Sequence, residues 1–124
     1  MKVFRIENKT CGSGPYHSDN RPASRYTTYK HLGPYHDGLY DYMDKDILFG
    51  FISEDTMAGW FIDSLMTLHN EGFICRIYVI NKIYVRVSRT YSQCIFDKKF
   101  AVSSEKVLSL KEIFEKYKRE IYST

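Results

Sequence analysis

The sequence predicts an α+β domain, in which a twisted and mainly antiparallel sheet carries a central helix and a C-terminal helix. Three observations support this fold class. Residues 47–80 have the pattern of a strand, a capped helix and a second strand. Residues 83–97 contain two further runs with the composition of strands, and residues 109–121 place apolar side chains at helical spacing. We expect one domain, 1–124, because 124 residues suffice for a single core.

The central unit, residues 47–80, contains the only tryptophan of the chain. The apolar run at its start, broken by Gly50, predicts a mostly buried strand. Ser53 can accept a hydrogen bond from the first turn of a helix, and the two acidic residues after it complement the helix dipole. Gly72 is a natural end for this helix, and residues 73–80 predict the next strand. The expected buried face of the helix consists of Met57, Trp60, Phe61, Ser64, Leu65 and Leu68.

Strands are also predicted before and after the central unit. Residues 2–7 predict an opening strand, because polar and apolar side chains alternate along it. Asn81-Lys82 is a two-residue turn signal, which predicts a hairpin between the strands at 73–80 and 83–88. In the opening strand, Phe4 and Ile6 are expected on one face and Val3, Arg5 and Glu7 on the other.

The last third of the chain adds another strand and a helix. Residues 91–97 predict a strand, with a short extension at 100–102. Ser109 and Glu112 form a capping box, which marks the start of a closing helix with one apolar and one charged face.

Residues 8–46 predict a long irregular N-terminal loop. They hold all three prolines and many Tyr, His, Asn and Asp residues, without a persistent period. Gly-Pro-Tyr-His occurs twice in it, and the repeat either presents two matching Tyr-His pairs or reflects ordinary turn chemistry. The histidine spacings match no standard metal site, so no metal is expected. The partner-binding residues expected in this loop are Tyr16, His17, Tyr35, His36, Tyr40 and Tyr42.

A basic stretch follows the central unit. Between residues 76 and 99 there are six basic residues, and Asp97 is the only acidic one. Arg76 and Arg86 alternate with apolar neighbours and are expected to project from one face of the predicted hairpin, with Arg89 just beyond it. Such a face suits nucleic acid, a nucleotide phosphate or an acidic protein. The alternative is an ordinary solvated sheet face.

Composition narrows the class of protein. The net charge of +3 is mild, and no apolar run reaches the 18 residues of a membrane span. The N-terminus becomes polar too early for a signal peptide, so we expect no membrane association. The odd number of cysteines, Cys11, Cys75 and Cys94, predicts reduced and buried thiols in a cytosolic protein.

Four short motifs resemble a group of small bacteriophage and prophage proteins. They are FRIE at 4–7, GSGPY at 12–16, FGFISEDTMAGWF at 49–61 and SQCIFD at 92–97. The resemblance is spread over most of the chain. It implies a phage or mobile-element origin without implying a particular activity.

A more distant resemblance is to the ADP-ribosyltransferases. Arg5 on the first strand and Ser53 after a later strand match two elements of that family by order and context. The resemblance implies that the Arg contacts the phosphates or ribose of NAD and that the Ser supports the site. The family's third element is Gln/Glu-x-Glu, whereas Gln93 is followed here by Cys and Ile. A neutral Gln stabilises the departing nicotinamide poorly, so the resemblance implies the fold more than the activity.

The leading hypothesis is a small phage-type accessory protein without a cofactor. It would bind a host protein or protein complex and inhibit or redirect it, in host takeover or anti-defence, with the Tyr/His loop and the basic hairpin as its contact surface. The first alternative is an ADP-ribosyltransferase-like enzyme using NAD, with Arg5, Tyr16, Ser53 and Gln93 around the nicotinamide. The second alternative is a nucleic-acid-binding module that uses Arg76, Arg86 and Arg89.

Overall fold

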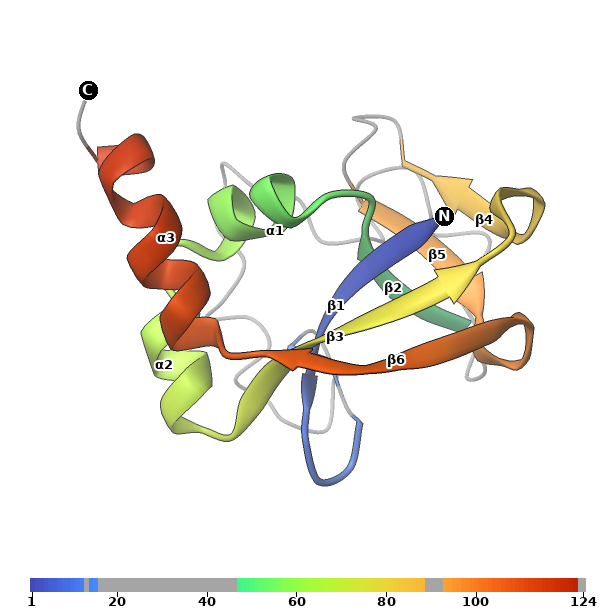
Figure 1. Cartoon of the computed structure of the whole chain (residues 1–124), viewed down its shortest axis with the longest axis horizontal. Helices are drawn as coiled ribbons and strands as arrows, with labels where there is room; N and C mark the ends of the chain where they lie inside the picture. The colour runs from blue at the N-terminus through green and yellow to red at the C-terminus, as the bar shows by residue number, and fades with distance from the viewer. Residues whose placement is uncertain (13, 16–46, 89–92, 123–124) are drawn as a thin grey trace.

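A computed structural model describes residues 1–12, 14–15, 47–88 and 93–122. In this part of the chain, six strands form one sheet in the order β4-β5-β2-β1-β3-β6 (Figure 1), and every neighbouring pair is antiparallel. The predicted α+β class is therefore confirmed. The strands are β1 Lys2–Asn8, β2 Ile47–Phe51, β3 Phe73–Ile80, β4 Val85–Val87, β5 Gln93–Asp97 and β6 Ala101–Leu108.

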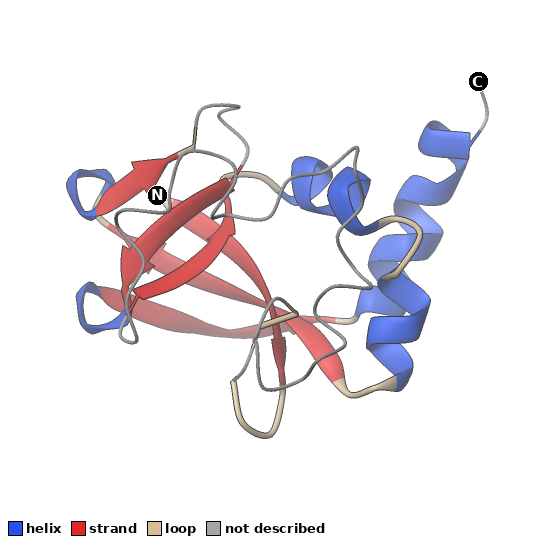
Figure 2. Cartoon of the chain, turned by 180° about the vertical axis from the view of Figure 1, so that it is seen from behind, coloured by secondary structure: helices blue, strands red, loops and turns tan. Residues whose placement is uncertain are grey.

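The three helices gather at one end of the sheet, as both views show (Figures 1 and 2). They are α1 Glu54–Phe61, α2 Leu65–Asn70 and α3 Leu110–Tyr122. Two short 3-10 turns, η5 Lys82–Tyr84 and η6 Lys98–Phe100, lie at the opposite end. The molecule thus has a helical end and an end made of sheet corners.

The core is divided between the two faces of the sheet. Ile6 packs with the apolar sides of the helices, including Phe61 and Leu65, whereas Val3 packs in a second cluster with Tyr78 and Phe96. This division follows from β1, because successive side chains of a strand point to opposite faces. The faces predicted for residues 2–7 are therefore confirmed.

The central unit begins and ends as predicted but is broken in the middle. The Ser53 hydroxyl accepts the N–H of Thr56 at 3.4 Å, and Gly72 adopts a φ of +91° directly after α2. The single helix that the sequence predicts is divided into α1 and α2. Between them the chain makes a tight turn, in which the N–H of Ser64 donates to the carbonyl of Phe61. Asp and Ser side chains compete for backbone hydrogen bonds, which favours an interruption at Asp63 and Ser64.

The predicted hairpin between residues 73–80 and 83–88 is wrong. The Asn81 side chain accepts the N–H of Ile83 at 3.1 Å and starts the turn η5 instead of a two-residue hairpin turn. The chain then crosses to the other edge of the sheet, where β4 pairs with β5. Three strands separate β3 from β4, so the basic hairpin expected from the sequence does not exist.

Strand β6 is longer than the extension predicted at 100–102, and its register is irregular. Its ladder with β3 pairs Tyr78 with Ser103 and Arg76 with Val107, so three residues of β6 lie opposite one residue of β3. Within this bulge, the Ser104 hydroxyl accepts the N–H of Lys106 at 3.2 Å. The polar run through the bulge hides the alternation by which the strand could be recognised in the sequence.

The remaining expectations divide between confirmed and wrong. The Ser109 hydroxyl accepts the N–H of Glu112 at 3.4 Å, which confirms the predicted start of α3. Cys75 and Cys94 are free and buried as predicted, but Cys11 is exposed, since it lies in the turn after β1 and not in a strand. None of the described helices is long and apolar enough to cross a membrane.

Candidate functional site

Arg5 lies at the centre of a buried ionic network on β1 and β3. Its guanidinium Nε is 3.3 Å from the carboxylate of Glu7, and the same carboxylate lies 3.1 Å from Nε of Arg76. The hydroxyl of Tyr78 donates to Glu7 at 2.8 Å. Burial lowers the pKa of Arg5 from its ordinary value, and the Glu7 charge acts in the opposite direction.

The guanidinium of Arg5 also joins parts of the backbone that the sheet leaves apart. β1 and β2 are registered at a single pair, Phe4 with Phe51. Arg5 donates to the carbonyl of Phe49 at 2.9 Å and to the carbonyl of Gly12 at 3.0 Å. These bonds fix the chain after β1 against β2, so the network acts as a structural anchor.

Gly14 shows how closely the chain packs on this anchor. A Cβ atom at Gly14 would lie 3.1 Å from the ring of Phe49 and 3.3 Å from two nitrogens of Arg5. The guanidinium carbon of Arg5 is itself 5.2 Å from the centre of the Phe49 ring. A side chain at position 14 would therefore crowd Phe49 and Arg5, which favours glycine there.

Arg5, Ser53 and Gln93 come from three different places in the fold, namely β1, the residue before α1 and β5. Gln93 pairs with Phe51, and Phe51 pairs with Phe4, so these three side chains share a face of the sheet. Arg5 follows Phe4 and projects from the other face. Gln93 is fully buried, and the Ser53 hydroxyl is engaged with Thr56 at the start of α1. The grouping of these residues around a nicotinamide stays a prediction, and Tyr16 lies outside the described residues.

The residues predicted to bind a partner are distributed differently from the expectation. Arg76 is partly buried in the ionic network, whereas Arg86 is exposed on the edge strand β4. Arg76 lies on β3 and Arg86 on β4, and three strands lie between β3 and β4 in the sheet. The two residues therefore do not share a hairpin face. The other predicted binding residues lie outside the described residues: Tyr16, His17, Tyr35, His36, Tyr40, Tyr42 and Arg89.

An exposed apolar surface that was not predicted from the sequence lies at the end of the sheet away from the helices. The described residues include seven large hydrophobic side chains that are exposed, and all but Val107 lie around η5, η6 and the adjoining strand ends. Ile83 and Val102 are the most open, at 72% and 71% exposure. We call this set the aromatic corner: Met1, Val79, Ile83, Tyr84, Phe100 and Val102.

The aromatic corner has a defined geometry. The rings of Tyr84 and Phe100 stack with centres 4.2 Å apart and an angle of 6° between their planes. Val79 and Val102 are paired across β3 and β6, and both are exposed. Exposed apolar side chains that are contiguous, and not scattered singly, commonly mark interaction sites.

Two hollows lie beside the ring of Phe100. The first, of 570 Å³, is lined by apolar side chains of β2, β4, β5 and the corner, together with Arg86 and Asp97. The second, of 600 Å³, is lined by residues at the ends of β1 and β3, with Lys82. Among the described residues, Phe100 alone lines both hollows.

Lysines surround the aromatic corner. Lys82, Lys98 and Lys99 are all exposed in the two 3-10 turns, and we call them the rim lysines. Nζ of Lys99 lies 5.1 Å from the centre of the Phe100 ring and 3.6 Å from the carboxylate of Asp97. Among the described residues that line the hollows, Asp97 is the only acidic one, so the field at the corner is positive.

No three His, Cys, Asp or Glu side chains come together as a metal site in the part of the chain that the structure describes. The sequence signal that could have revealed the corner is the pair of short segments Lys-Ile-Tyr and Lys-Lys-Phe, which place lysine beside exposed apolar residues. The sequence instead predicts a hairpin turn at Asn81-Lys82 and a short strand extension at 100–102, because a 3-10 conformation has no pattern of its own in the sequence.

Among models of protein families, the one described as the bacteriophage T4 Y00F protein matches residues 1–110. No curated protein and no solved structure matches the chain.

Proposed function

Because the chain belongs to the bacteriophage T4 Y00F protein family, it is a small phage protein, and we propose that it binds a host protein and inhibits or redirects it. Family membership confirms the expected phage origin. The host partner and the effect on it are the proposal, and the aromatic corner replaces the predicted hairpin as the contact surface.

The observation that carries this proposal is the concentration of exposed apolar side chains in the aromatic corner. Burying the exposed parts of Ile83, Tyr84, Phe100 and Val102 in an interface would contribute about 5 kcal/mol. A micromolar dissociation constant requires about 8 kcal/mol. Association also costs translational and rotational freedom, so contacts in the hollows and with the rim lysines must add to this apolar burial.

A protein partner fits the corner better than nucleic acid does. Nucleic-acid interfaces are strongly polar and basic, because phosphate contacts dominate them. The corner has basic residues, but its most exposed members are the aliphatic side chains of Ile83 and Val102. Aliphatic groups with an aromatic centre and a charged rim are the arrangement found in protein interfaces.

Affinity capture from a lysate of the bacterial host tests the proposal, followed by titration of the purified partner. The test variant is Ile83→Glu, which replaces a side chain that is 72% exposed and therefore leaves the core intact. The matched control is Val107→Glu, the one exposed large hydrophobic residue described outside the corner. We expect Ile83→Glu to weaken binding at least tenfold and Val107→Glu to change it less than twofold.

Salt dependence separates the alternatives. Nucleic-acid affinity falls by roughly one decade per decade of salt for each phosphate contact, whereas burial of apolar groups is not screened. A partner that proves to be nucleic acid, or a protein that binds Ile83→Glu as tightly as the native chain, would contradict the proposal.

A further inference from the structure

We infer that the aromatic corner recognises a short, extended, acidic segment of its partner, with one apolar side chain of the segment in each of the two hollows. The inference rests on the proposed function and specifies the chemistry of the partner. It follows from the ring of Phe100, the shape of the hollows and the charge around them.

Phe100 forms a fixed ridge. Its ring is stacked on that of Tyr84 with centres 4.2 Å apart, and each of the two residues is 44% exposed, so the pair stands out from the surface. Phe100 lines both hollows, and no other described residue does. A ligand that fills both hollows must therefore pass over this ring.

Both hollows are open to solvent, and each is large enough to receive a side chain of a partner. Their volumes of 570 and 600 Å³ lie within the range of about 300–1,000 Å³ that is typical of binding pockets. In an extended chain, residues i and i+2 project on the same side, about 7 Å apart. That spacing suits two side chains that descend on either side of one aromatic ring.

The lining of each hollow accepts an apolar side chain. The first hollow includes Ile83, Val85 and Phe96, and the second includes Val79 and Ile80. The polar groups stand among these apolar walls, with Arg86 and Asp97 in the first and Lys82 in the second. An apolar side chain with acidic neighbours is therefore complementary to both.

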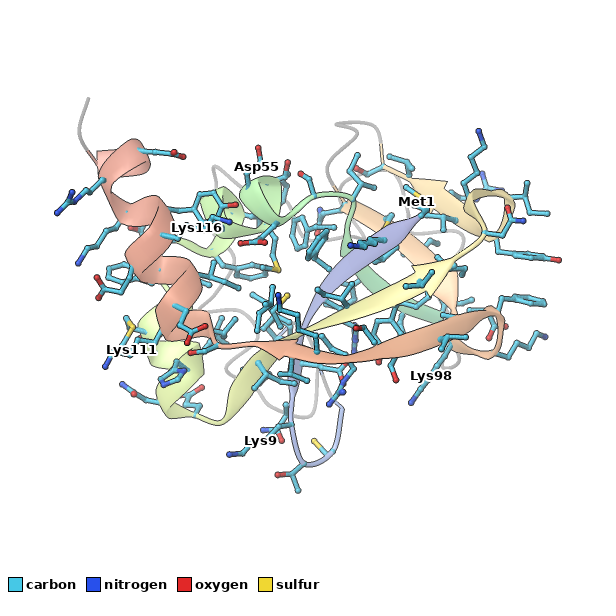
Figure 3. All side chains as sticks on the ribbon, viewed as in Figure 1. Met1, Lys9, Asp55, Lys98, Lys111 and Lys116 are labelled. Atoms are coloured by element: carbon cyan, nitrogen blue, oxygen red, sulfur yellow. The ribbon has the colours of Figure 1, made fainter. Side chains whose placement is uncertain are left out.

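The rim lysines indicate that the bound segment is acidic. Lys82 lines the second hollow, Lys98 is exposed in η6 two residues before Phe100, and Lys99 lies beside the Phe100 ring and Asp97. The positive charge of the lysines disfavours basic partners. Acidic side chains beside the two apolar side chains of the segment are attracted to the lysines. Figure 3 shows that Lys98 and Lys111 lie at opposite ends of the molecule, which makes Lys111 a matched control for the charge.

The test uses an array of nine-residue peptides probed with the full chain. Two apolar residues are placed one, two, three or four positions apart, and the remaining positions are acidic, neutral or basic. We expect the strongest signal from acidic peptides with a spacing of two. Equal binding at every spacing, or binding that is indifferent to charge, would overturn the inference.

The best peptide is then measured by fluorescence anisotropy against three variants. Phe100→Ala removes the ridge, Lys98→Glu reverses a rim charge, and Lys111→Glu reverses an exposed charge on α3. We expect at least a tenfold loss for each of the first two and less than a twofold change for the third. Lys98 is exposed, so its variant reports on binding even where Phe100→Ala lowers stability. Equal affinity of Lys98→Glu and the native chain would contradict the assigned charge.

Competition separates this inference from the proposed function. The best peptide should displace the captured host partner from the native chain. A partner that depends on Ile83 but is not displaced would leave the proposed function standing and refute recognition of a linear segment. A single-stranded oligonucleotide that displaces the peptide at physiological salt would refute both.

Discussion

Replacing Glu7 by Gln should be one of the most destabilising conservative changes in this protein. Glu7 is 5% exposed and is the one carboxylate whose oxygens lie within 3.3 Å of both Arg5 and Arg76 in the described network. The amide keeps the size of the side chain but leaves the Arg5 charge without compensation. Breaking a buried ion pair by removing one partner costs about 3–5 kcal/mol. Because the amide oxygen can still accept one hydrogen bond, we expect about 3 kcal/mol.

Arg76→Gln is the matched control within the same network. The Arg76 side chain is 25% exposed, so water solvates part of the charge in this pair. We expect this change to cost about 1 kcal/mol. The difference between the two variants, about 2 kcal/mol, then measures how much burial magnifies the loss of charge at Glu7.

Urea unfolding followed by tryptophan fluorescence measures both variants. Trp60 is the only tryptophan, and its ring centre is 5.7 Å from that of Phe51 beneath the helices, so its emission reports on the core. At about 4 °C for each kcal/mol, Glu7→Gln should also lower the Tm by about 12 °C. A loss below about 1 kcal/mol, or one no larger than that of Arg76→Gln at equal m-values, would refute the reasoning.

Three further predictions concern packing and protonation. Gly50→Ala should destabilise by about 1–3 kcal/mol in urea unfolding, since a Cβ atom there would lie 2.6 Å from a side chain of β1; an unchanged midpoint would show that β1 shifts freely. One thiol, Cys11, should react rapidly with a thiol reagent, while Cys75 and Cys94 react only on unfolding, because burial raises the pKa of each to about 12; rapid loss of more than one thiol per chain would contradict this. The free energy of unfolding should fall as the pH rises from about 9 towards 12. Burial raises the pKa of Tyr78 to about 12 as well, so Tyr78 and the two buried thiols keep their protons to higher pH in the folded state than in the unfolded state. A free energy of unfolding that stays constant over this range would show that these groups titrate alike in both states.

The strands and helices that are specified by local signals could be predicted from the sequence. Ser53 and Gly72 mark the limits of the helical region by capping chemistry, which depends only on the residues themselves. The alternation along 2–7 indicates the faces of β1, because one strand lies between two cores. These features need no information about which strand lies beside which.

Strand pairing and the candidate site could not be predicted in the same way. Asn81 has the chemistry of a hairpin turn, yet it caps a 3-10 turn, because the next strand finds its partner at β5 and not at β3. Pairing of that kind depends on contacts distant in sequence, and the irregular ladder of β6 adds three polar residues without alternation. The aromatic corner arises only when η5 and η6 meet, so no single segment of the sequence contains it.

The bulge in β6 has a consequence for the behaviour of the protein at high concentration. β6 is the last strand of the described sheet, and a regular strand of eight residues in that place would offer a template for pairing with another chain. Since three residues of β6 lie opposite one of β3, the outer edge is divided into two short pieces that do not form one straight ladder. We therefore expect that the exposed apolar side chains of the aromatic corner can lie beside the open edge of β6 without that edge nucleating aggregation.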